Sequence, residues 1–534
     1  KALGLFLKFQ VGTTNLTKSN FHKNILVVDD EVEMLKPHFL FLEERGYDLT
    51  PCTNGQDALD LIIEKLFDII LLDENMPGLN GLETLNEIKN IQPRLPVIMI
   101  TKNEEEHIME EAIGSKISDY LIKPVNPHQI LLSLKKTLNV KNLVAEKTTQ
   151  NYQQEFIKIS NSLLDLETHE DWIDYFKKLM FWELELESLE DNSMFEIFET
   201  QMKEANIQFA KFISSNYIKW MEESEGPPLS HTVFKKYVLP ELRQHQPTLL
   251  IMIDNLRYDQ WKTILPELNT DFSVDKEYTY FSILPTTTQY ARNSFFSGLT
   301  PLDIEKKYPQ WWKNDSDEGG KNLFEKELLK EQCDKLGLNR PISYHKITKL
   351  EQSNQLVKNL QNHFHEGLTA VVYNFVDMIS HAKTEMEVIK ELAPDNKAYR
   401  SLTLSWFKNS SLKKLLKKAS KLGFKVIITT DHGTINVGHP SVVIGNKETS
   451  VNLRYKTGKS ITYETKDVIE CIDPKSFRLP STSINNRYIF AKEDHYFVFK
   501  NNYNKYANYF KNTFQHGGVS LEEMIIPFIV LNPR

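Results

Sequence analysis

The chain has 534 residues, 40% of them hydrophobic and 25% charged, so it is long enough for two to four globular domains. Its formal net charge of −8 gives no general attraction to nucleic acid, so we expect no direct DNA binding. Three cysteines without CxxC spacing exclude a disulfide framework and indicate a reducing compartment, with the cytoplasm as the expected location. No apolar run approaches the roughly 18–20 residues of a membrane-spanning helix, so no membrane insertion is expected.

Residues 1–23 begin without Met and mix short apolar stretches with Thr, Asn and Lys. We expect a leader or an upstream extension here. A secretory signal is the competing interpretation, and it is disfavoured because Lys8 and Gln10 break the apolar stretch.

Residues 24–138 alternate short apolar runs with helical patterns, which predicts a doubly wound parallel sheet. Polar residues follow the predicted strands, and the carboxyl ends of parallel strands meet at one edge of a sheet. Three carboxylates gathered there would repel one another unless a cation joined them, and Mg²⁺ suits such a site. Phosphate could then be transferred to Asp73. The strand-end residues are Asp29 and Asp30, then Asp73, Thr101 and Lys123.

The motifs VVDDE, LLDENMPGLNG, MITK and YLIKP make this segment similar to the response-regulator receiver family, which has a flavodoxin-like fold. The resemblance implies phosphorylation of Asp73, a cis Lys123–Pro124 bond, and a homodimer that forms on phosphorylation. It assigns one Mg²⁺ to Asp29, Asp30, Asp73 and the backbone carbonyl of Asn75, the phosphoryl oxygens to Thr101 and Lys123, and the aromatic switch to Tyr120.

Residues 139–225 contain no Pro and no Gly, and their large apolar residues recur at helical spacing, as in Trp172, Phe176 and Leu179. We predict a bundle of about three helices. Gly226-Pro227-Pro228 ends it, because prolines cannot continue a helix. A bundle between the receiver and an effector at residues 226–534 is placed to pass on a dimerisation event.

In the effector segment, three apolar runs lead into aspartates: LLIMI into Asp254, AVVYNFV into Asp377 and VIITT into Asp431. Carboxylate and imidazole side chains would thereby collect at one edge of a parallel sheet. A donor set of this size without thiolates suits two Zn²⁺ or related ions. The histidines of the set are His381, His432 and His516.

The segment LPTTTQYARNSFFSGLTP offers a nucleophile, because a threonine-rich turn leads into a helix that we expect to begin near Thr288. Backbone N–H groups at a helix N-terminus favour both an alkoxide and an incoming phosphate. An ordinary helix cap is the alternative role for this residue. Asn255 and Arg257, close after Asp254, and Arg292, one helical turn after Thr288, are candidates for binding substrate phosphate. The two arginines could equally be surface ion-pair partners.

The motifs IDNLRYD, PTTTQYARNSFFSG, VDMISH, TTDHG and QHGG make residues 247–533 similar to the PglZ branch of the alkaline phosphatase superfamily. The resemblance implies an alkaline phosphatase-like α/β domain and in-line attack by Thr288. Thr288 has the family's spacing to Gly298, although Thr286 and Thr287 stay open as alternatives. The resemblance assigns one ion to Asp254, Thr288, Asp431 and His432 and the other to Asp377, His381 and His516.

The whole chain, an α/β multidomain protein with a helical segment between its two domains, resembles regulators of type IX secretion. That resemblance implies a sensor histidine kinase, a sigma factor and a secretion-motor component as partners. It also favours a zinc-dependent phosphodiesterase, rather than a phosphomonoesterase, acting on cyclic or linear oligonucleotides. The alternative is a non-catalytic sensor of metal or nucleotide that acts through phosphorylation-dependent dimerisation and protein partners.

Overall fold

A computed structural model gives the fold and describes residues 23–93, 95–102, 117–189, 193–222, 226–244 and 246–534. The chain divides into two compact units, Lys1–Glu155 and Phe156–Arg534. The expected leader lies outside the described residues up to residue 22, and the first strand begins at Lys23.

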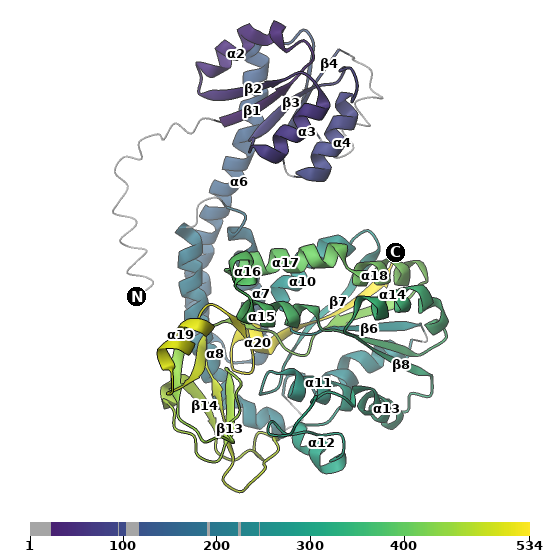
Figure 1. Cartoon of the computed structure of the whole chain (residues 1–534), viewed down its shortest axis with the longest axis vertical. Coiled ribbons are helices and arrows are strands. Elements are labelled where there is room, and N and C mark those ends of the chain that lie inside the picture. Colours follow the sequence, from purple (N-terminus) through teal and green to yellow (C-terminus); the bar gives the residue numbers. More distant parts are fainter. Residues whose placement is uncertain (1–22, 94, 103–116, 190–192, 223–225, 245) are drawn as a thin grey trace. The chain divides into compact units, whose positions relative to one another are not determined.

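The first unit is built on a five-stranded sheet with the order β2-β1-β3-β4-β5, in which all paired strands are parallel (Figure 1). Apolar side chains are buried on both of its faces, which confirms the predicted doubly wound fold. The strands are β1 (Lys23–Val28), β2 (Tyr47–Cys52), β3 (Ile69–Asp73), β4 (Val97–Thr101) and β5 (Asp119–Ile122), and the helices are η1 (Val32–Leu35), α2 (Lys36–Glu43), α3 (Gly55–Glu64) and α4 (Gly81–Ile91).

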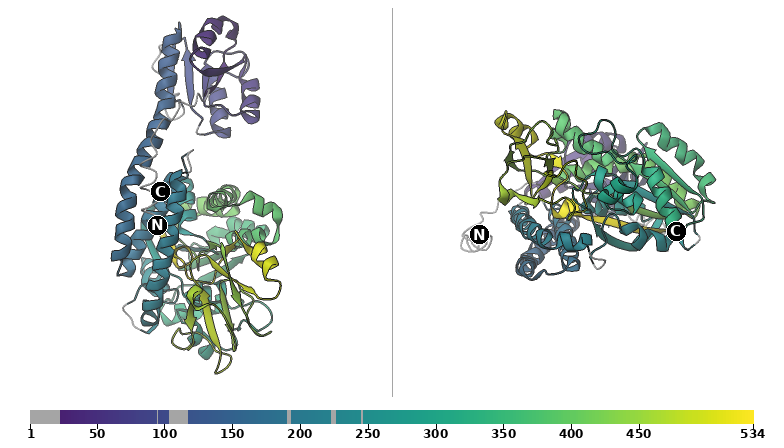
Figure 2. Two further views of the ribbon diagram at one scale, coloured as in Figure 1. Left: turned by 90° about the vertical axis from the view of Figure 1, so that its left-hand side faces the viewer. Right: turned by 90° about the horizontal axis from the view of Figure 1, so that it is seen from below.

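Three long helices follow, α6 (Pro127–Ser162), α7 (His169–Leu186) and α8 (Ser193–Glu222). A capping box of Thr168 and Asp171 begins α7. The expected apolar stripe is buried, with Trp172 packing edge-on against Phe209 of α8 at a ring distance of 5.2 Å. Helices α7 and α8 lie against the C-terminal α/β domain (Figure 2), where Trp220 of α8 contacts Phe281 at 5.2 Å.

The C-terminal domain contains a six-stranded sheet with the order β7-β18-β10-β6-β9-β8. Strands β10, β6, β9 and β8 are mutually parallel, whereas β18 runs antiparallel to both of its neighbours. The α/β class is therefore confirmed, and the sheet is mixed rather than wholly parallel. Its strands are β6 (Thr248–Ile253), β7 (Phe272–Phe281), β8 (Ile342–Ile347), β9 (Leu368–Tyr373), β10 (Lys425–Thr429) and β18 (Ile525–Pro533).

Helices cover this sheet and enclose an apolar core that includes Trp261 and Phe424. Most of them are short, as expected for connections between neighbouring strands. The helices of the domain are α9 (Leu239–Leu242), α10 (Tyr258–Ile264), α11 (Thr288–Ser297), α12 (Pro301–Lys307), α13 (Glu325–Lys335), α14 (Leu350–Asn359), α15 (Phe375–Glu385), α16 (Glu387–Leu392), α17 (Asn396–Asn409), α18 (Ser411–Lys421), α19 (Tyr503–Phe510) and α20 (Leu521–Met524), with short single turns η3 (Phe234–Val238), η4 (Leu265–Leu268), η5 (Leu360–His363) and η6 (Thr465–Asp467). A further single turn, η2 (Leu163–Asp165), lies between α6 and α7.

Between β10 and β18 the chain forms three smaller sheets, β11-β17, β12-β16 and β13-β15-β14. They surround two small apolar cores, one with Val443 and Phe497 and the other with Val437 and Tyr496. The strands are β11 (Ile435–Asn436), β12 (His439–Val443), β13 (Tyr455–Gly458), β14 (Val468–Cys471), β15 (Arg487–Ala491), β16 (His495–Phe499) and β17 (Phe514–Gln515).

Candidate active site

Asp254, Asp431 and His432 lie together at the carboxyl ends of two adjacent parallel strands. Asp254 directly follows β6, and Asp431 and His432 come just after β10, its neighbour in the sheet. All three side chains are buried, and one ligand atom from each lies within 4.8 Å of the others. The order of the strands therefore produces this first group, as expected of an open α/β sheet.

Thr288 joins the first group from the N-terminus of α11. Its Oγ1 lies 3.3 Å from Asp254 Oδ1 and 3.2 Å from His432 Nε2. Thr286 is fully buried, and its Oγ1 accepts from the backbone N–H of Gly517 at 3.0 Å. Thr287 is the N-cap of the helix, and its buried hydroxyl has no hydrogen-bond partner. Thr288 is the partly exposed one of the three, so a substrate can reach it.

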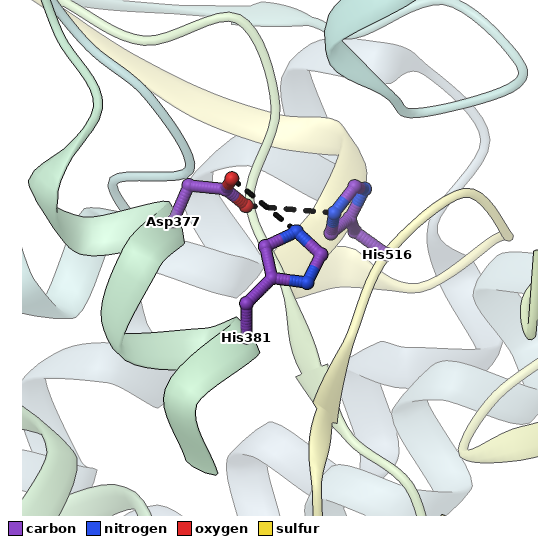
Figure 3. A group of neighbouring side chains, drawn as sticks. All are labelled: Asp377, His381 and His516. Carbon is purple, nitrogen blue, oxygen red and sulfur yellow. Dashed lines mark ion pairs between the residues drawn. The ribbon is translucent and has the colours of Figure 1, made fainter. Parts of the chain in front are cut away.

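Asp377, His381 and His516 form a second group (Figure 3). Helix α15 begins at Phe375, so the apolar run AVVYNFV does not extend as a strand into Asp377, as its pattern suggested. Asp377 and His381 instead lie four residues apart on one helix face, with His381 Nε2 3.4 Å from Asp377 Oδ2. His516 follows β17, and its Nε2 is 3.6 Å from Asp377 Oδ1.

The two groups are neighbours. The rings of His432 and His516 stack with their centroids 4.3 Å apart, which joins the first group to the second. His381 has an exposed side chain, with 65% of its surface accessible, so the second group faces solvent on that side. The side chains of the first group are thus buried, whereas the second group is exposed to solvent at His381.

Burial and nearby positive charge act in opposite directions on the pKa values of the two carboxyl groups in the first group. Burial raises the pKa of Asp254 well above the usual carboxyl range, although Arg292 opposes the shift. Burial also acts on Asp431, but Arg292 and His432 outweigh it, and the pKa of Asp431 falls below its ordinary value. Two neighbouring carboxylates therefore differ in proton affinity, as expected for acidic groups crowded into a site of low polarity.

In the second group, the pKa values of both His516 and Asp377 are lowered. Burial lowers the pKa of His516 to about 3, so its imidazole is neutral at physiological pH, which is the form that binds metal. Burial would raise the pKa of Asp377, but His381 and His516 outweigh it and lower the pKa below its usual range. Asp377 Oδ1 is buried and lacks a hydrogen-bond partner, as expected of an oxygen that would bind a cation. Nitrogen and oxygen donors without thiolate make both groups candidate sites for a divalent cation, and their chemistry suits zinc.

Arg292 lies behind the first group rather than in the open part of the site. It is fully buried, its Nε is 2.9 Å from Asp431 Oδ2, and its Nη2 pairs closely with Asp254 Oδ2. A third carboxylate, Glu325, lies 3.6 Å from its Nη1. Arg292 thus contacts two candidate metal ligands, and its role in binding substrate phosphate stays a prediction.

Arg257 and Asn255 are both buried in the loop after β6. Arg257 pairs with Asp259, its Nε donating at 2.8 Å, so the structure does not bring it to either group. Asn255 has a left-handed backbone with φ 65°, and its backbone N–H points to Asp431 Oδ1 at 3.4 Å. Its side-chain amide donates to Ser380 of α15 at 3.0 Å. Asn255 therefore joins the segments that carry the two groups.

Glu523 supports the site, and the sequence analysis did not single it out. This fully buried carboxylate accepts from the backbone N–H of Gly518 at 2.9 Å and from Ser520 Oγ at 2.8 Å. It also pairs with Arg454 at 2.6 Å, and Thr286 Oγ1 lies 3.4 Å away. Glu523 thereby fixes the QHGG loop against the threonine turn. Its sequence context, SLEEMIIP, resembles an ordinary helix start and carries no signal of this role.

The receiver contains a third group, Asp29, Asp30 and Asp73, whose ligand atoms also lie within 4.8 Å of one another. Lys123 Nζ is 2.9 Å from Asp29 Oδ2 and 2.8 Å from Asp73 Oδ1, and the Lys123–Pro124 bond is cis. Burial raises the pKa of Asp73, although Lys123 opposes the shift.

Three further receiver residues were predicted to act with Asp73. Thr101 Oγ1 donates to Glu74, and Tyr120 is 39% exposed. The Asn75 side chain is exposed, whereas the predicted ligand is its backbone carbonyl. Lys123, Asp29 and Asp30 thus lie at Asp73, and the switch roles of Thr101 and Tyr120 stay predictions.

Three known families match successive segments of the chain, which correspond to the receiver, the linker helices and the C-terminal domain. Residues 25–135 match the response regulator receiver domain, residues 142–221 the PorX response regulator linker domain, and residues 233–531 the BREX system PglZ alkaline phosphatase-like domain.

Individual relatives match over shorter stretches. The transcriptional regulatory protein ZraR of Klebsiella oxytoca is 34% identical over 139 residues, which are 26% of this chain and 31% of that protein. SrrA of Staphylococcus aureus (strain NCTC 8325 / PS 47) is 27% identical over 145 residues, 27% of this chain and 60% of that protein. The chain thus spans less than two thirds of the length of either relative. The crystal structure of TrrA from Thermotoga maritima in complex with Mg²⁺ and BeF is 30% identical and covers 22% of this chain and 99% of its own, with a TM-score of 0.20.

The receiver sheet, the helical linker and the α/β domain together define a response regulator that carries an alkaline phosphatase-like domain. Since the PglZ match spans more than half of its length, the chain belongs to the PglZ alkaline phosphatase-like family, in the PorX-type architecture of receiver, linker and PglZ domain. In the described residues, no helix has both the length and the apolar character to cross a membrane.

Proposed function

We propose that the chain is a phosphorylation-regulated, zinc-dependent phosphodiesterase whose nucleophile is Thr288. The observation that supports this most directly is the position of Thr288 Oγ1, within 3.3 Å of Asp254 and 3.2 Å of His432. A hydroxyl held at a helix N-terminus among candidate metal ligands is suited to attack an anionic phosphorus centre.

Each group of side chains would hold one zinc ion, with Thr288 Oγ1 added to the first. When bound, two such ions supply Lewis acidity, which lowers the pKa of the hydroxyl and stabilises negative charge on the phosphoryl oxygens. The first group is buried, whereas Thr288 is partly exposed and the exposed His381 side leaves room for the ester.

The reaction has two displacements at phosphorus. Thr288 Oγ1 forms a bond to phosphorus as the bond to the leaving alcohol breaks, and the hydroxyl proton ends on that alcohol. The product is a diester of Thr288. Water then attacks the same phosphorus, the bond to Thr288 Oγ1 breaks, and a phosphate monoester leaves while the hydroxyl regains a proton.

A diester is the favoured substrate because the two arginines that could have bound phosphate are paired with buried carboxylates, Arg292 with Asp254 and Asp431 and Arg257 with Asp259. Little side-chain positive charge therefore remains for the second negative charge of a monoester. Cyclic or linear oligonucleotides are the proposed natural substrates, in keeping with the PorX-type architecture. A role in type IX secretion, with a sigma factor and a secretion-motor component as partners, has the same support.

Steady-state hydrolysis of bis-para-nitrophenyl phosphate by the full chain with added Zn²⁺ tests the proposal. Wild type should turn over, Thr288→Ala and Asp431→Ala should not, and Thr287→Ala should retain most of the rate because that hydroxyl has no partner. Equal rates in all four proteins would end the enzymatic interpretation. Tight binding of Zn²⁺ and a dinucleotide by a wild type that does not turn over would favour a non-catalytic sensor.

A further inference from the structure

The linker helices α7 and α8 make buried polar contacts that reach three separate segments carrying the candidate site, two of them directly and the third through Arg400. The contacts come from Tyr217 and Asn206 of α8 and from Glu183 of α7. The three segments are the threonine turn before α11, the loop between β17 and β18, and the loop after β6.

Tyr217 holds the segment that leads to the nucleophile. Its hydroxyl accepts a hydrogen bond of 2.8 Å from the backbone N–H of Leu284, four residues before Thr288. Both residues are almost fully buried. A buried backbone N–H without a partner is costly, so this hydroxyl stabilises one position of the turn.

Asn206 holds the segment that follows His516. Its side-chain carbonyl accepts from the backbone N–H of Leu521 at 2.8 Å, and its amide donates to Glu522 at 3.1 Å. The carbonyl oxygen of Glu522 in turn lies against Gly433, where a Cβ atom would come within 1.9 Å of it. Because Gly433 directly follows His432, the position of α20 affects both histidines that stack between the two groups.

Glu183 reaches the loop after β6 through a buried ion-pair chain. Arg400 Nη1 donates to Glu183 Oε1 at 2.8 Å and also pairs with Asp259, which binds Arg257. Arg257 lies three residues after Asp254. Glu183, Arg400 and Asp259 are each at least 97% buried, so water does not screen these contacts.

We infer that α7 and α8 belong to the active unit, with Tyr217, Asn206 and Glu183 as positioning residues that set the geometry between the nucleophile and the two metal groups. The inference rests on the proposed function for its catalytic meaning. The three segments come from different parts of the chain, and α7 and α8 give them a common support outside the sheet. Gln201 of α8 also binds Phe156 and Ser160 of α6, the helix that begins at Pro127 in the receiver unit. The linker is therefore the element through which a change in the receiver would reach the site.

Matched substitutions in the full chain test this inference. Tyr217→Phe removes the hydroxyl that holds the turn, and Tyr175→Phe removes an equally buried hydroxyl of α7 that has no hydrogen-bond partner. Asn206→Leu removes the amide that holds α20, and Gln201→Met removes a buried amide of α8 that binds α6. For each protein we would measure Zn²⁺ affinity by competition with a chromogenic chelator, the kcat and KM for bis-para-nitrophenyl phosphate, and thermal unfolding.

Tyr217→Phe and Asn206→Leu should each lose about tenfold or more in Zn²⁺ affinity or in kcat with little change in KM, because residues that orient metal ligands have effects of this size. Tyr175→Phe and Gln201→Met should stay close to wild type in both quantities. Equal Zn²⁺ affinity and kcat in Tyr217→Phe, Asn206→Leu and wild type would overturn the inference, as would equal losses in test and control variants. If wild type does not turn over, the proposed function fails, and the Zn²⁺ affinities still decide the positioning role.

Discussion

The Thr288 hydroxyl is the smallest feature on which the proposed chemistry depends, and it can be removed without changing the shape of the side chain. Thr288→Val should lower kcat by on the order of a thousandfold or more, whereas Thr288→Ser keeps an oxygen at the same place and should remain measurably active. Hydrolysis of bis-para-nitrophenyl phosphate checks both. A valine variant as active as the serine variant would assign the attack to another group.

Arg292 neutralises two buried carboxylates, Asp254 and Asp431, so its substitution should destabilise the fold. A bound metal cation should compensate for part of the lost positive charge. We expect Arg292→Gln to lower the free energy of unfolding by about 3–5 kcal/mol, since a buried carboxylate loses its partner. Urea unfolding with and without Zn²⁺ measures the effect, and added Zn²⁺ should stabilise this variant more than it stabilises wild type.

Arg257→Gln is the matched control for that measurement. Arg257 is equally buried, but its partner is Asp259, away from both groups. The control should lose stability without gaining any extra response to Zn²⁺. An equal Zn²⁺ response in both variants would mean that Asp254 and Asp431 do not bind the metal.

Glu522 makes folding depend on pH. Burial raises its pKa from 4.5 to about 7, so its favourable contribution is complete below pH 4.5 and is lost as the pH rises through 7. Glu522→Gln should therefore match wild type near pH 5 and exceed it near pH 8, by about 3 kcal/mol at most. Urea unfolding across this range tests it, with exposed Glu327→Gln as a control that should follow the wild-type profile. Parallel profiles for Glu522→Gln and wild type would contradict the prediction.

Residue patterns located the clustered Asp and His side chains better than the residues that support them. Asp254 and Asp431 could be found because a carboxylate after a buried parallel strand is unusual and lies at a known edge of the sheet. Glu523 and Tyr217 could not be found, because each acts through one backbone N–H group distant in sequence, and no local pattern marks such a contact. The environment of Arg292 was missed for the same reason. Its position on the helix could be predicted, but its burial among carboxylates distant in sequence could not.

At the scale of elements, α20 and the TTDHG loop are in direct contact. Gly433 has no room for a side chain, because a Cβ atom would lie 1.9 Å from the carbonyl oxygen of Glu522. Gly433→Ala should force α20 and His432 apart and reduce Zn²⁺ affinity by about tenfold or more. Gly423→Ala is the control, with open space around it and only the cost of its positive φ. Unchanged Zn²⁺ affinity in Gly433→Ala would show that α20 does not constrain the ligand loop.

The sequence predicted most helices and strands of the two α/β domains. It did not predict all of their boundaries, strand directions and packing partners. The run AVVYNFV is apolar throughout, so periodicity could not mark the point at which β9 ends and α15 begins. Strand β18 is buried on both faces like a parallel strand, and its antiparallel direction depends on pairing with β7 and β10 across long separations. The packing of α7 and α8 on Phe281 could not be predicted either, because an amphipathic pattern identifies a buried helix face but not the residue against which it packs.

At the scale of the whole molecule, the receiver should control association. In the structure Lys123 binds Asp29 and Asp73, Thr101 donates to Glu74, and Tyr120 is 39% exposed. A phosphoryl group on Asp73 supplies new oxygens for Lys123 and Thr101, and Tyr120 can then follow Thr101 inward and change the surface. We expect the mass of the full chain to double on treatment with beryllofluoride, as measured by light scattering at micromolar protein.

Two variants separate this mechanism from non-specific association. Asp73→Ala cannot bind beryllofluoride and should remain a monomer. Thr101→Ala keeps Asp73 but lacks the hydroxyl that would bind the new oxygens on Asp73. If the signal passes through Thr101, Thr101→Ala should bind beryllofluoride, seen by fluorine NMR, and dimerise more weakly than wild type. A wild-type mass that stays unchanged at saturated Asp73 would reject dimerisation, and control of the PglZ domain would then have to act within one chain, along α6 and the linker helices.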